Sequence, residues 1–463
     1  MVTEAVTEAL PRQSAASPSP PTSTKLNLVL AACCLGQFMV ILDGSVVNVA
    51  LGVINEDFTF RANSLQWVTN SYAIVYAGFL LLGGRLADLF GRRRMFLLGI
   101  VIFTLASLAC GVAFDATSLV VARGFQGLGA AIMAPATLTV LGTTFTEPGQ
   151  RARAFGLWGA AGGVGGAIGV LLGGMFTEWL SWRWILLINI PIGAALFAAV
   201  AYSVTETRIQ SAERKLDIPG SLSITAGLMA VVYGIAEGAL VPLGIGVVVL
   251  AFFFLNEAKL AKQPLVPLDF FRNRSVSAAN FVAITASAAI FSVFYFFTLF
   301  MQQVLGYTPI QTGLVYLPLS LGIFLGARGL APHVTSIGPR RILVVGLSLS
   351  ALGMLWLSQA SSHAGYLTHL LGPSILLGLG QGIVMTGTAM AATANLPYHQ
   401  AGLASGVLNT TRQLGGAVGL AALVAISNAQ QTLASGYLLA FLVSAGFLAV
   451  AIIPALFAPG GKR

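Results

Sequence analysis

The sequence predicts an all-α, polytopic membrane protein, and three features of its composition carry that prediction. Of its 463 residues, 56% are apolar, and the mean hydropathy is +0.86. Only 8% are charged (24 Lys or Arg and 15 Asp or Glu), against about 25% in an average soluble domain. A water-soluble fold of this length could not cover its surface with so few polar groups. Soluble enzymes, disordered scaffolds and nucleic-acid-binding proteins are therefore not expected.

The surplus of basic residues gives a net charge of +9, but their positions argue against a nucleic-acid-binding face. They stand in short loops between apolar runs, where Lys and Arg orient membrane spans. The three cysteines (Cys33, Cys34 and Cys110) lie inside apolar runs, without metal-ligand spacing. We interpret them as small buried hydrophobic residues and expect neither a metal site nor a disulfide.

The apolar runs divide the chain into spans from its N-terminus onward. Residues 1–26 are rich in Ser, Pro and Thr, which predicts a disordered tail. The first apolar run is too long for a signal-peptide core and no small-residue cleavage site follows it, so we expect it to remain as a span. A helix needs about 20 apolar residues to cross the hydrocarbon core. Twelve runs meet this length in two groups of six: 27–54, 64–84, 95–114, 118–142, 153–176 and 183–204, then 276–304, 309–332, 341–360, 368–393, 401–427 and 434–458.

Between the two groups lies segment 218–256, which has 39 residues and Glu237 as its only charge. It could cross the membrane once, twice or not at all, and cytoplasmic loops carry an excess of Lys and Arg. With a cytoplasmic N-terminus, two crossings put 19 basic residues in the cytoplasm, two outside and three within spans, whereas one crossing gives 11 against 10. One crossing is therefore rejected. With no crossing, the number of basic residues on each side is the same as with two crossings. The segment's length and a turn marked by Gly238 and Pro242 favour two crossings and therefore fourteen spans, with both termini in the cytoplasm.

Three glycine-containing patterns recur in the same order, at offsets of 247, 251 and 250 residues. The pairs are Gly91–Gly99 with Gly338–Gly346, Gly127–Gly129 with Gly378–Gly380, and Gly165–Gly169 with Gly415–Gly419. Such internal repeats are typical of transporters built from two similar halves. We therefore divide the chain into a cytoplasmic tail (1–26), an N-terminal six-span half (27–204), a central linker with two extra spans (205–275), a C-terminal six-span half (276–458) and a cytoplasmic tail (459–463).

Motifs in the first half carry a family resemblance that covers the chain from about residue 27 to its C-terminus. The loop Gly84–Arg94 (GRLADLFGRRR) resembles the signature loop of the major facilitator superfamily. Leu42–Leu51 (LDGSVVNVAL) resembles the span 1 motif of its fourteen-span drug:proton antiporter branch, and Arg123–Ala131 (RGFQGLGAA) resembles the span 4 motif. Gly165–Gly174 (GGAIGVLLGG) is similar to the antiporter motif of span 5, and Trp182–Pro191 resembles the segment that comes after that motif in the family.

The resemblance implies two six-helix halves and two inserted spans, which alternate between inward- and outward-open states. It also implies proton-coupled efflux of amphipathic small molecules, antibiotics among them, by a monomer in the cytoplasmic membrane. No cofactor is expected, because the proton-motive force drives transport and the sequence has no Walker loop for ATP. Leu89 stands where the signature loop usually has a basic residue, and Val170 where the antiporter motif has proline, which leaves the kinking of span 5 open.

Two charged residues lie within the first-half spans, and each needs a functional or structural explanation, because placing a charge in the membrane costs free energy. Asp43 lies 18 residues, or about 27 Å, beyond Lys25, in the outer half of span 1. It either belongs to a structural ion pair or is a hydrogen-bonded acid, or it handles protons or substrate, because burial favours the protonated form that a proton carrier needs. Arg123 enters span 4 at a similar depth, where it either extends to the interface or, as the resemblance implies, is buried and governs proton release.

Further polar residues are candidates for proton coupling or substrate contact. Asn48 and Gln126 belong to the span 1 and span 4 motifs. Arg412 lies about eleven residues into its span beside other polar residues, so we expect it to line a cavity. Gln302 and Gln303 could line a substrate cavity together with the neighbouring aromatic residues 295–297, although such aromatic stripes are more often part of a core.

Two motifs suggest moving parts. In the signature loop, Asp88 could cap the next helix or pair with arginine and so lock the outward-facing state, or the charges could set the topology alone. The loop residues that we assign to gating are Gly84, Asp88, Gly91, Arg92 and Arg93. In span 5, glycines remove side chains from one helix face and permit close packing and sliding of two helices. These antiporter-motif glycines are Gly165, Gly166, Gly169, Gly173 and Gly174.

Two other functions compete with efflux. A proton-coupled uptake permease for a small nutrient or metabolite would need a denser set of polar or ionic residues in mid-span than this sequence has. The other alternative is a membrane-embedded enzyme or assembly factor. Such an enzyme would show His, Asp or Glu clustered at one membrane face, and the sequence has no such cluster. A charge-poor cavity suits apolar or weakly cationic drugs. The sequence therefore predicts a drug exporter that is not an enzyme.

Overall fold

The structure of the protein is a computed structural model that describes residues 23–60, 64–207, 216–261, 264–330, 337–361, 365–394, 396 and 401–458. Every regular element within these ranges is helical. The first half contains α1 (Ser23–Phe58), α2 (Trp67–Phe90), α3 (Arg92–Gly111), α4 (Ala116–Thr144), α5 (Pro148–Trp179), α6 (Trp184–Leu187) and α7 (Asn189–Ser203). Next come α8 (Ile218–Glu237), α9 (Leu240–Leu255), a π-helical turn (Asn256–Leu260) and a 3-10 turn (Leu268–Arg272). The second half contains α10 (Arg274–Leu299) with a π-helical turn (Phe300–Val304), α11 (Pro309–Leu330), α13 (Pro339–Leu357), a π-helical turn (Tyr366–Leu371), α14 (Gly372–Thr393), α15 (Ala401–Asn428) and α16 (Leu433–Ala455).

The predicted fold class is confirmed. Thirteen helices of the described chain are long and apolar enough to cross a membrane, and each coincides with a predicted span. The remaining predicted span, 401–427, coincides with α15, which has 28 residues and contains the polar run Asn409–Gln413. Residues 1–22 and 459–463 of the predicted tails lie outside the described residues, and α1 begins at Ser23, inside the segment predicted as tail.

The segment between the halves forms a helical hairpin, as two crossings require. Asp217 begins α8, because its Oδ1 accepts a hydrogen bond from the backbone N–H of Gly220 at 2.8 Å. Gly238 ends α8 in the left-handed conformation (φ 63°, ψ 24°) that glycine adopts readily. Pro242 lies in the first turn of α9, where no backbone N–H is needed. The hairpin turn is therefore where the sequence predicts it.

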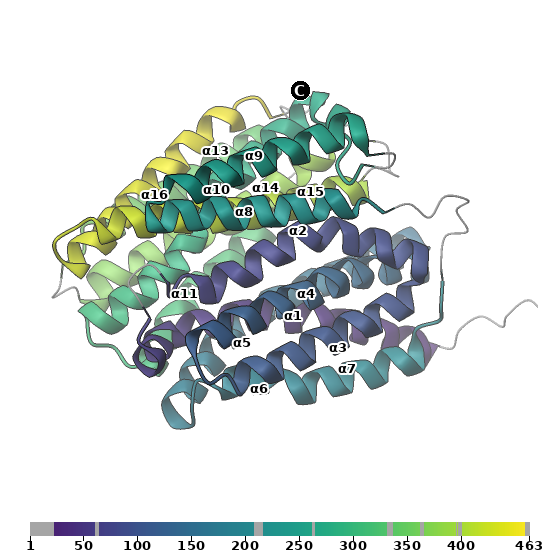
Figure 1. The fold of residues 1–463 in the computed structure, drawn as a ribbon, viewed down its shortest axis with the longest axis horizontal. Coiled ribbons are helices and arrows are strands. Elements are labelled where there is room, and N and C mark those ends of the chain that lie inside the picture. Colours follow the sequence, from purple (N-terminus) through teal and green to yellow (C-terminus); the bar gives the residue numbers. More distant parts are fainter. Residues whose placement is uncertain are drawn as a thin grey trace, which may run out of the picture.

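Figure 1 shows α1–α7 grouped on one side of the bundle and α10–α16 on the other, with the α8–α9 hairpin lying along the junction. The two groups repeat the same packing. Gly127 lets α4 approach the backbone of α2 at Tyr72, and Gly378 lets α14 approach that of α11 at Leu319. At both glycines a Cβ atom would overlap the partner's carbonyl oxygen. The recurring glycines are thus close-contact points between equivalent helices.

Two seams join the halves. Along one, α2 packs against α15, and α8 contacts both helices, so the hairpin covers this seam. Along the other, α5 meets α11, where a Cβ at Gly174 would lie 2.6 Å from the carbonyl oxygen of Pro309. This contact lies near the C-terminus of α5, at what we call the distal end of the bundle. We call the opposite end, where α1 and α5 begin, the basic end. Gly156 and Gly163, nearer the basic end of α5, have no atom within 4 Å of a Cβ position.

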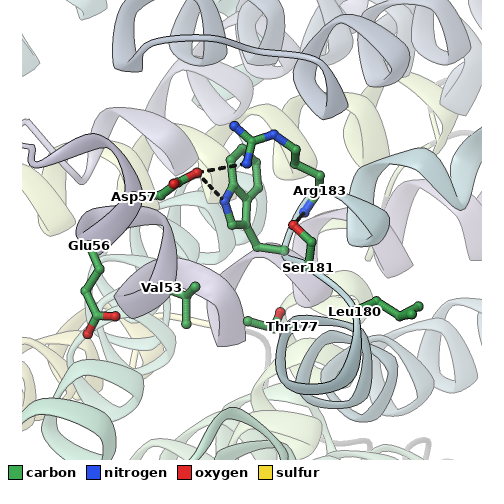
Figure 2. A pocket seen from close by; sticks show the side chains of 8 residues that line it. Val53, Glu56, Asp57, Thr177, Leu180, Ser181 and Arg183 are labelled. Carbon is green, nitrogen blue, oxygen red and sulfur yellow. Dashed lines mark hydrogen bonds and ion pairs between the residues drawn. The ribbon is translucent and has the colours of Figure 1, made fainter.

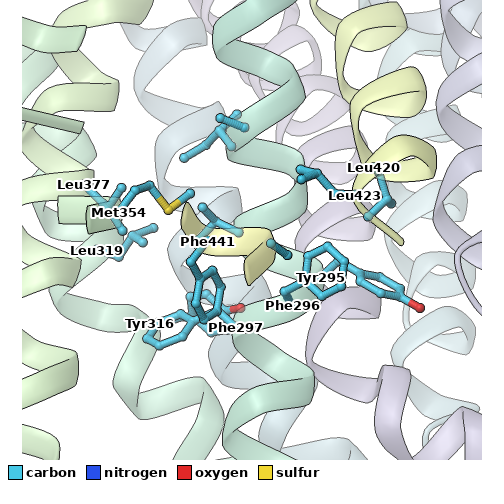
Figure 3. Close-up of a cluster of buried hydrophobic side chains, with 14 of the residues drawn as sticks. Tyr295, Phe296, Phe297, Tyr316, Leu319, Met354, Leu377, Leu420, Leu423 and Phe441 are labelled. Atoms are coloured by element: carbon cyan, nitrogen blue, oxygen red, sulfur yellow. The ribbon is translucent and has the colours of Figure 1, made fainter. Parts of the chain in front are cut away.

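Aromatic rings fill the core of the second half (Figure 3). The rings of Tyr295, Phe296 and Phe297 are almost fully buried, and Phe297 lies edge-on to Tyr316 with 5.5 Å between ring centroids. A second edge-on contact joins Phe297 to Phe441 at 6.4 Å. The aromatic stripe of this span is therefore packed core and not the lining of a cavity.

Candidate functional site

A buried network of polar side chains lies inside the first half, around Asp43. Arg123 Nη1 donates to Asp43 Oδ2 at 2.5 Å, and Gln126 Nε2 and Asn189 Nδ2 donate to Oδ1 at 2.7 and 3.0 Å. Asp43 is 0% exposed and Arg123 1%. Three donors around two oxygens, one of them a guanidinium, fit an ionised carboxylate better than a carboxylic acid. The network therefore holds a buried, charge-compensated ion pair.

The Arg123 guanidinium is held on all sides. Its Nε donates to the carbonyl oxygen of Val68 at 3.1 Å, and Nη1 also donates to Gln126 Oε1 at 2.8 Å. The guanidinium carbon lies 4.5 Å from the centroid of the Tyr72 ring, a cation–π contact. Arg123 therefore points into the half, and the alternative that it extends to the membrane interface does not describe this structure.

The local sequence explains how these groups meet. Arg123 and Gln126 are three residues apart in α4, so they lie on one helix face. Gly127 follows them and allows α2 to approach closely, which brings the Tyr72 ring against the guanidinium. Asp43 reaches the same point from α1, which also contacts α4 and α7.

Two members of the network were not predicted as site residues. Asn189 is the first residue of α7, and Ser107 lies on α3. The Ser107 hydroxyl accepts from Gln126 Nε2 and Asn189 Nδ2, both at 3.0 Å, and donates to the carbonyl oxygen of Leu186 at 2.8 Å. The position of Asn189 in the motif after span 5 was the available signal, whereas a lone serine in an apolar span gives none.

The ion pair joins a titratable side chain of α1 to an arginine of α4. Removing one partner of a buried ion pair leaves an uncompensated charge, at a cost of about 3–5 kcal/mol. The pair of Asp43 with Arg123 therefore holds α1 against α4 at this depth.

The other predicted polar residues lie apart from Asp43. Asn48 donates to a backbone carbonyl one turn back in its own helix, at 2.9 Å. Gln302 Nε2 crosses between the halves and donates to the carbonyl oxygen of Val49 at 2.8 Å. Gln303 Oε1 accepts from the hydroxyl of Tyr437 at 2.6 Å. The structure thus brings Asp43, Arg123 and Gln126 together, and leaves these three residues outside their network.

Arg412 forms a separate site in the second half. Its Nη2 donates to the carbonyl oxygen of Met385 at 3.1 Å and to Thr388 Oγ1 at 2.6 Å, both on α14. No Asp or Glu of the described residues forms an ion pair with it. Arg412 is thus a charged residue of mid-span that lacks the compensation Arg123 has.

The signature loop links α2, α3 and the end of α7 at the basic end. Asp88 pairs with Arg92 at 3.1 Å, one turn along the chain, and does not cap α3. Arg93 Nη2 donates to the carbonyl oxygen of Ala201 at 2.6 Å. Of the two roles predicted for Asp88, the structure shows the pairing with arginine.

A glutamate that was not predicted as a site residue stands at the N-terminus of α3. Glu206 accepts hydrogen bonds from the backbone N–H groups of Arg93 and Arg94, at 3.3 and 3.2 Å. Such a carboxylate also interacts favourably with the positive end of the helix dipole. Gly91 precedes the helix with φ 111°, and a Cβ there would overlap the Glu206 carboxylate. Glu206 follows the last predicted span of the first half by two residues, so only its position at a span end could have identified it.

The glycines of α5 form a contact face for α1. Gly165, Gly169 and Gly173 lie one turn apart and approach the α1 backbone at Phe38, Leu42 and Val46. Of the other two motif glycines, Gly174 faces α11 and Gly166 makes only an ordinary contact with Ile41. The predicted loss of side chains from one face is present, and α1, the helix that carries Asp43, fills it. Gly84 of the signature loop packs against Pro135 of α4.

A shallow recess of about 460 Å³ lies at the distal end (Figure 2). In it, Asp57 Oδ2 accepts from Trp182 Nε1 at 2.9 Å and from Arg183 Nη1 at 2.8 Å. These contacts tie the end of α1 to the turn after α5. Asp57 and Arg183 are 42% and 34% exposed, so this is a surface clamp and not part of the buried network.

Comparison with known proteins gives consistent results. Residues 33–420 match the Major Facilitator Superfamily. The chain is 40% identical to the cephamycin export protein CmcT of Amycolatopsis lactamdurans over 449 residues, covering 93% of this chain and 92% of that protein. It is 40% identical to the puromycin resistance protein pur8 of Streptomyces alboniger over 432 residues (90% and 85%), and 33% identical to the tetracenomycin C resistance and export protein of Streptomyces glaucescens over 404 residues (85% and 74%). Among solved structures, the POT family transporter PepTSo has a similar fold, with a TM-score of 0.70 over 95% of this chain and 98% of that one at 16% identity.

Proposed function

The chain belongs to the major facilitator superfamily, and we propose that it exports drug-like small molecules across the cytoplasmic membrane in exchange for protons. The similar proteins include two named as export proteins and one named as a resistance protein, and each is matched over 85–93% of this chain. The observation that carries the proton part of the proposal is the buried ion pair of Asp43 with Arg123.

The distribution of basic residues supports an orientation. At the basic end, the described residues include Lys25, Arg85, Arg92–Arg94, Arg151 and Arg153, together with Arg340 and Arg341 of the second half. Among the described basic residues, Arg183 lies at the distal end. Because cytoplasmic loops carry the excess of Lys and Arg, we assign the basic end and both termini to the cytoplasm.

The seams support a transport cycle that begins with the cytoplasmic side accessible. At the distal end the halves meet where Gly174 approaches Pro309 and where Gln302 donates to Val49. Nearer the basic end, Gly163 of α5 faces open space. A drug enters from the cytoplasmic side, and rocking of the halves then opens the distal end.

Helix α1 connects Asp43 to the seam between the halves at the distal end. Asp43 and Val49 are six residues apart on α1, or about 9 Å. The backbone at Val49 and the nearby Gly52 contact Gln302 of the second half at the distal seam. Protonation of Asp43 weakens its hold on Arg123, frees α1 to slide on the glycine face of α5, and so loosens the seam. The coupling is conformational, since Asp43 is 0% exposed and does not contact the space between the halves.

Everted membrane vesicles from an efflux-deficient host test the proposal, with ethidium and radiolabelled puromycin as probes. Energised vesicles with the wild-type protein should accumulate a probe, and a protonophore should collapse the accumulation. Asp43→Asn, which keeps the size but removes the titration, should abolish accumulation driven by a pH gradient. Active accumulation in intact cells would identify an uptake permease instead, and near wild-type accumulation by Asp43→Asn would refute the assigned coupling residue.

A further inference from the structure

Three charged side chains lie at mid-depth in the bundle, away from the helix ends: Asp43, Arg123 and Arg412. The first two neutralise each other, 2.5 Å apart inside the first half. Arg412 forms no ion pair with any acidic residue in the part of the chain that the structure describes. The middle of the bundle therefore carries one uncompensated positive charge, although a charge at this depth is costly without a partner.

The contacts of α15 show which way this side of the helix faces. Thr410 Oγ1 donates to the carbonyl oxygen of Ala77 on α2, and Thr411 Oγ1 donates to Asn280 Oδ1 on α10. Successive residues of a helix are about 100° apart. Arg412 therefore lies about 200° from the α2 side, just past the α10 side. Since α2 belongs to the other half, this is the side of α15 that faces its own half, where the guanidinium reaches α14.

The guanidinium has donors to spare. Both of its hydrogen bonds, to Met385 and Thr388, come from Nη2. Nε and Nη1 form no hydrogen bond with another described residue, and the side chain is only partly buried. A two-point contact of arginine with a carboxylate uses Nη2 together with either Nε or Nη1. The structure thus holds Nη2 in place by α14 and leaves Nε and Nη1 as separate single donors, each able to donate to one oxygen of a carboxylate.

The surroundings of Arg412 are apolar. Gly416, one turn further along α15, packs against the Phe291 ring, and the Met385 side chain is 42% exposed. An anion at the guanidinium would therefore sit beside ring and thioether surfaces that suit an apolar body. An inorganic anion would leave these surfaces unused.

We infer that Arg412 receives a carboxylate of the exported molecule, so that amphipathic organic acids are a preferred substrate class of this transporter. The inference rests on the proposed export function and names the substrates of that function. It differs from the expectation that the sequence alone supports, which is a preference for apolar or weakly cationic drugs. The compensating negative charge arrives with the substrate, which explains why the described residues supply none.

The test compares a cephalosporin carboxylate with its methyl ester in everted vesicles, since the two probes differ in charge but hardly in shape. Wild-type vesicles should accumulate both probes, the acid faster. Arg412→Gln should lower the ratio of acid to ester export about tenfold, and Arg412→Lys, which keeps the charge, should hold the ratio within about threefold of wild type. Thr386→Val, which removes a hydroxyl of α14 whose hydrogen bonds go to the backbone carbonyls of Ala327 and Gly382, serves as a matched control and should change both probes alike.

The other outcomes distinguish a wrong inference about Arg412 from a wrong export function. If Arg412→Gln leaves the acid-to-ester ratio unchanged, or lowers export of both probes equally, the inference is wrong while the export function stands. If Arg412→Gln stops all transport, equilibrium binding of the two probes to the purified variant decides. A selective loss of acid binding supports the inference, and an equal loss for acid and ester overturns it. If the wild-type protein exports neither these probes nor ethidium and puromycin, the proposed function itself fails.

Discussion

Replacing Asp43 by asparagine should destabilise the protein through the charge left on Arg123, and not through lost packing. The carboxylate accepts hydrogen bonds from Arg123, Gln126 and Asn189 at 2.5–3.0 Å in a site that is fully buried. The asparagine has almost the same shape, but it leaves the guanidinium without an anion. Breaking a buried pair in this way costs about 3–5 kcal/mol, or two to three and a half orders of magnitude in the unfolding equilibrium.

A double-mutant cycle separates this electrostatic cost from other effects. Asp43→Asn/Arg123→Gln removes both charges, so we expect it to regain most of the stability that Asp43→Asn loses. Unfolding of the purified proteins in mixed micelles, followed by tryptophan fluorescence, measures all four corners of the cycle. Transport driven by a pH gradient should remain absent in both Asp43 variants, because stability returns without a titrating group.

Two results would refute this reasoning. If Asp43→Asn is as stable as the wild type, the pair does not compensate a buried charge. If the double variant is no more stable than Asp43→Asn, the loss comes from hydrogen bonding or packing, and the charge on Arg123 is not its cause.

Three further predictions address topology, packing and gating. A cysteine at Ala239, in the turn between α8 and α9, should react with an impermeant thiol reagent in intact cells, and labelling only after permeabilisation would contradict two crossings. Gly127→Ala should cost several kcal/mol, since its Cβ would overlap the carbonyl oxygen of Tyr72, whereas Gly163→Ala, with no atom within 4 Å, should be neutral or slightly stabilising in thermal unfolding. Asp88→Asn removes the 3.1 Å ion pair with Arg92 and should slow transport while leaving the Kd for drug within about threefold, so an equal loss of both would argue against a gating role.

The helices could be predicted from the sequence because the bilayer imposes their length. Apolar runs identified twelve spans, the count of Lys and Arg excluded thirteen, and the length of segment 218–256 with its turn at Gly238 favoured fourteen. The ends of the helices were less predictable. Helix α1 continues to Phe58, four residues past the predicted span, because a helix does not end where its residues become polar. In the last span of the first half, a break between Leu187 and Asn189 was not predicted, although Asn189 and Pro191 are residues that mark the start of a helix.

The site was predictable only in part. Asp43 and Arg123 are identifiable because a charge in a span is rare, and Gln126 because it belongs to the span 4 motif. Ser107 is one of many serines in apolar helices, and its place in the network depends on how α3 packs against α4. The absence of an acidic partner for Arg412 among the described residues is likewise a property of packing and not of composition.

The two arginines give the two halves different electrical roles, and this has an energetic consequence for transport. A proton that enters through Asp43 moves one charge across the membrane, which supplies about 2.3 kcal/mol per 100 mV. If Arg412 carries an anionic drug outward in the same cycle, a second charge equivalent moves down the same potential, because a negative charge leaves a negative interior. For one proton per drug molecule the potential then supplies about 4.6 kcal/mol per 100 mV, enough for a drug gradient of roughly 2000-fold, against about 45-fold for a neutral drug. Export of a carboxylate should therefore depend on membrane potential twice as steeply as export of its ester in the same vesicles. Equal dependence would mean that the anion's charge is cancelled during the cycle, for example by a second proton.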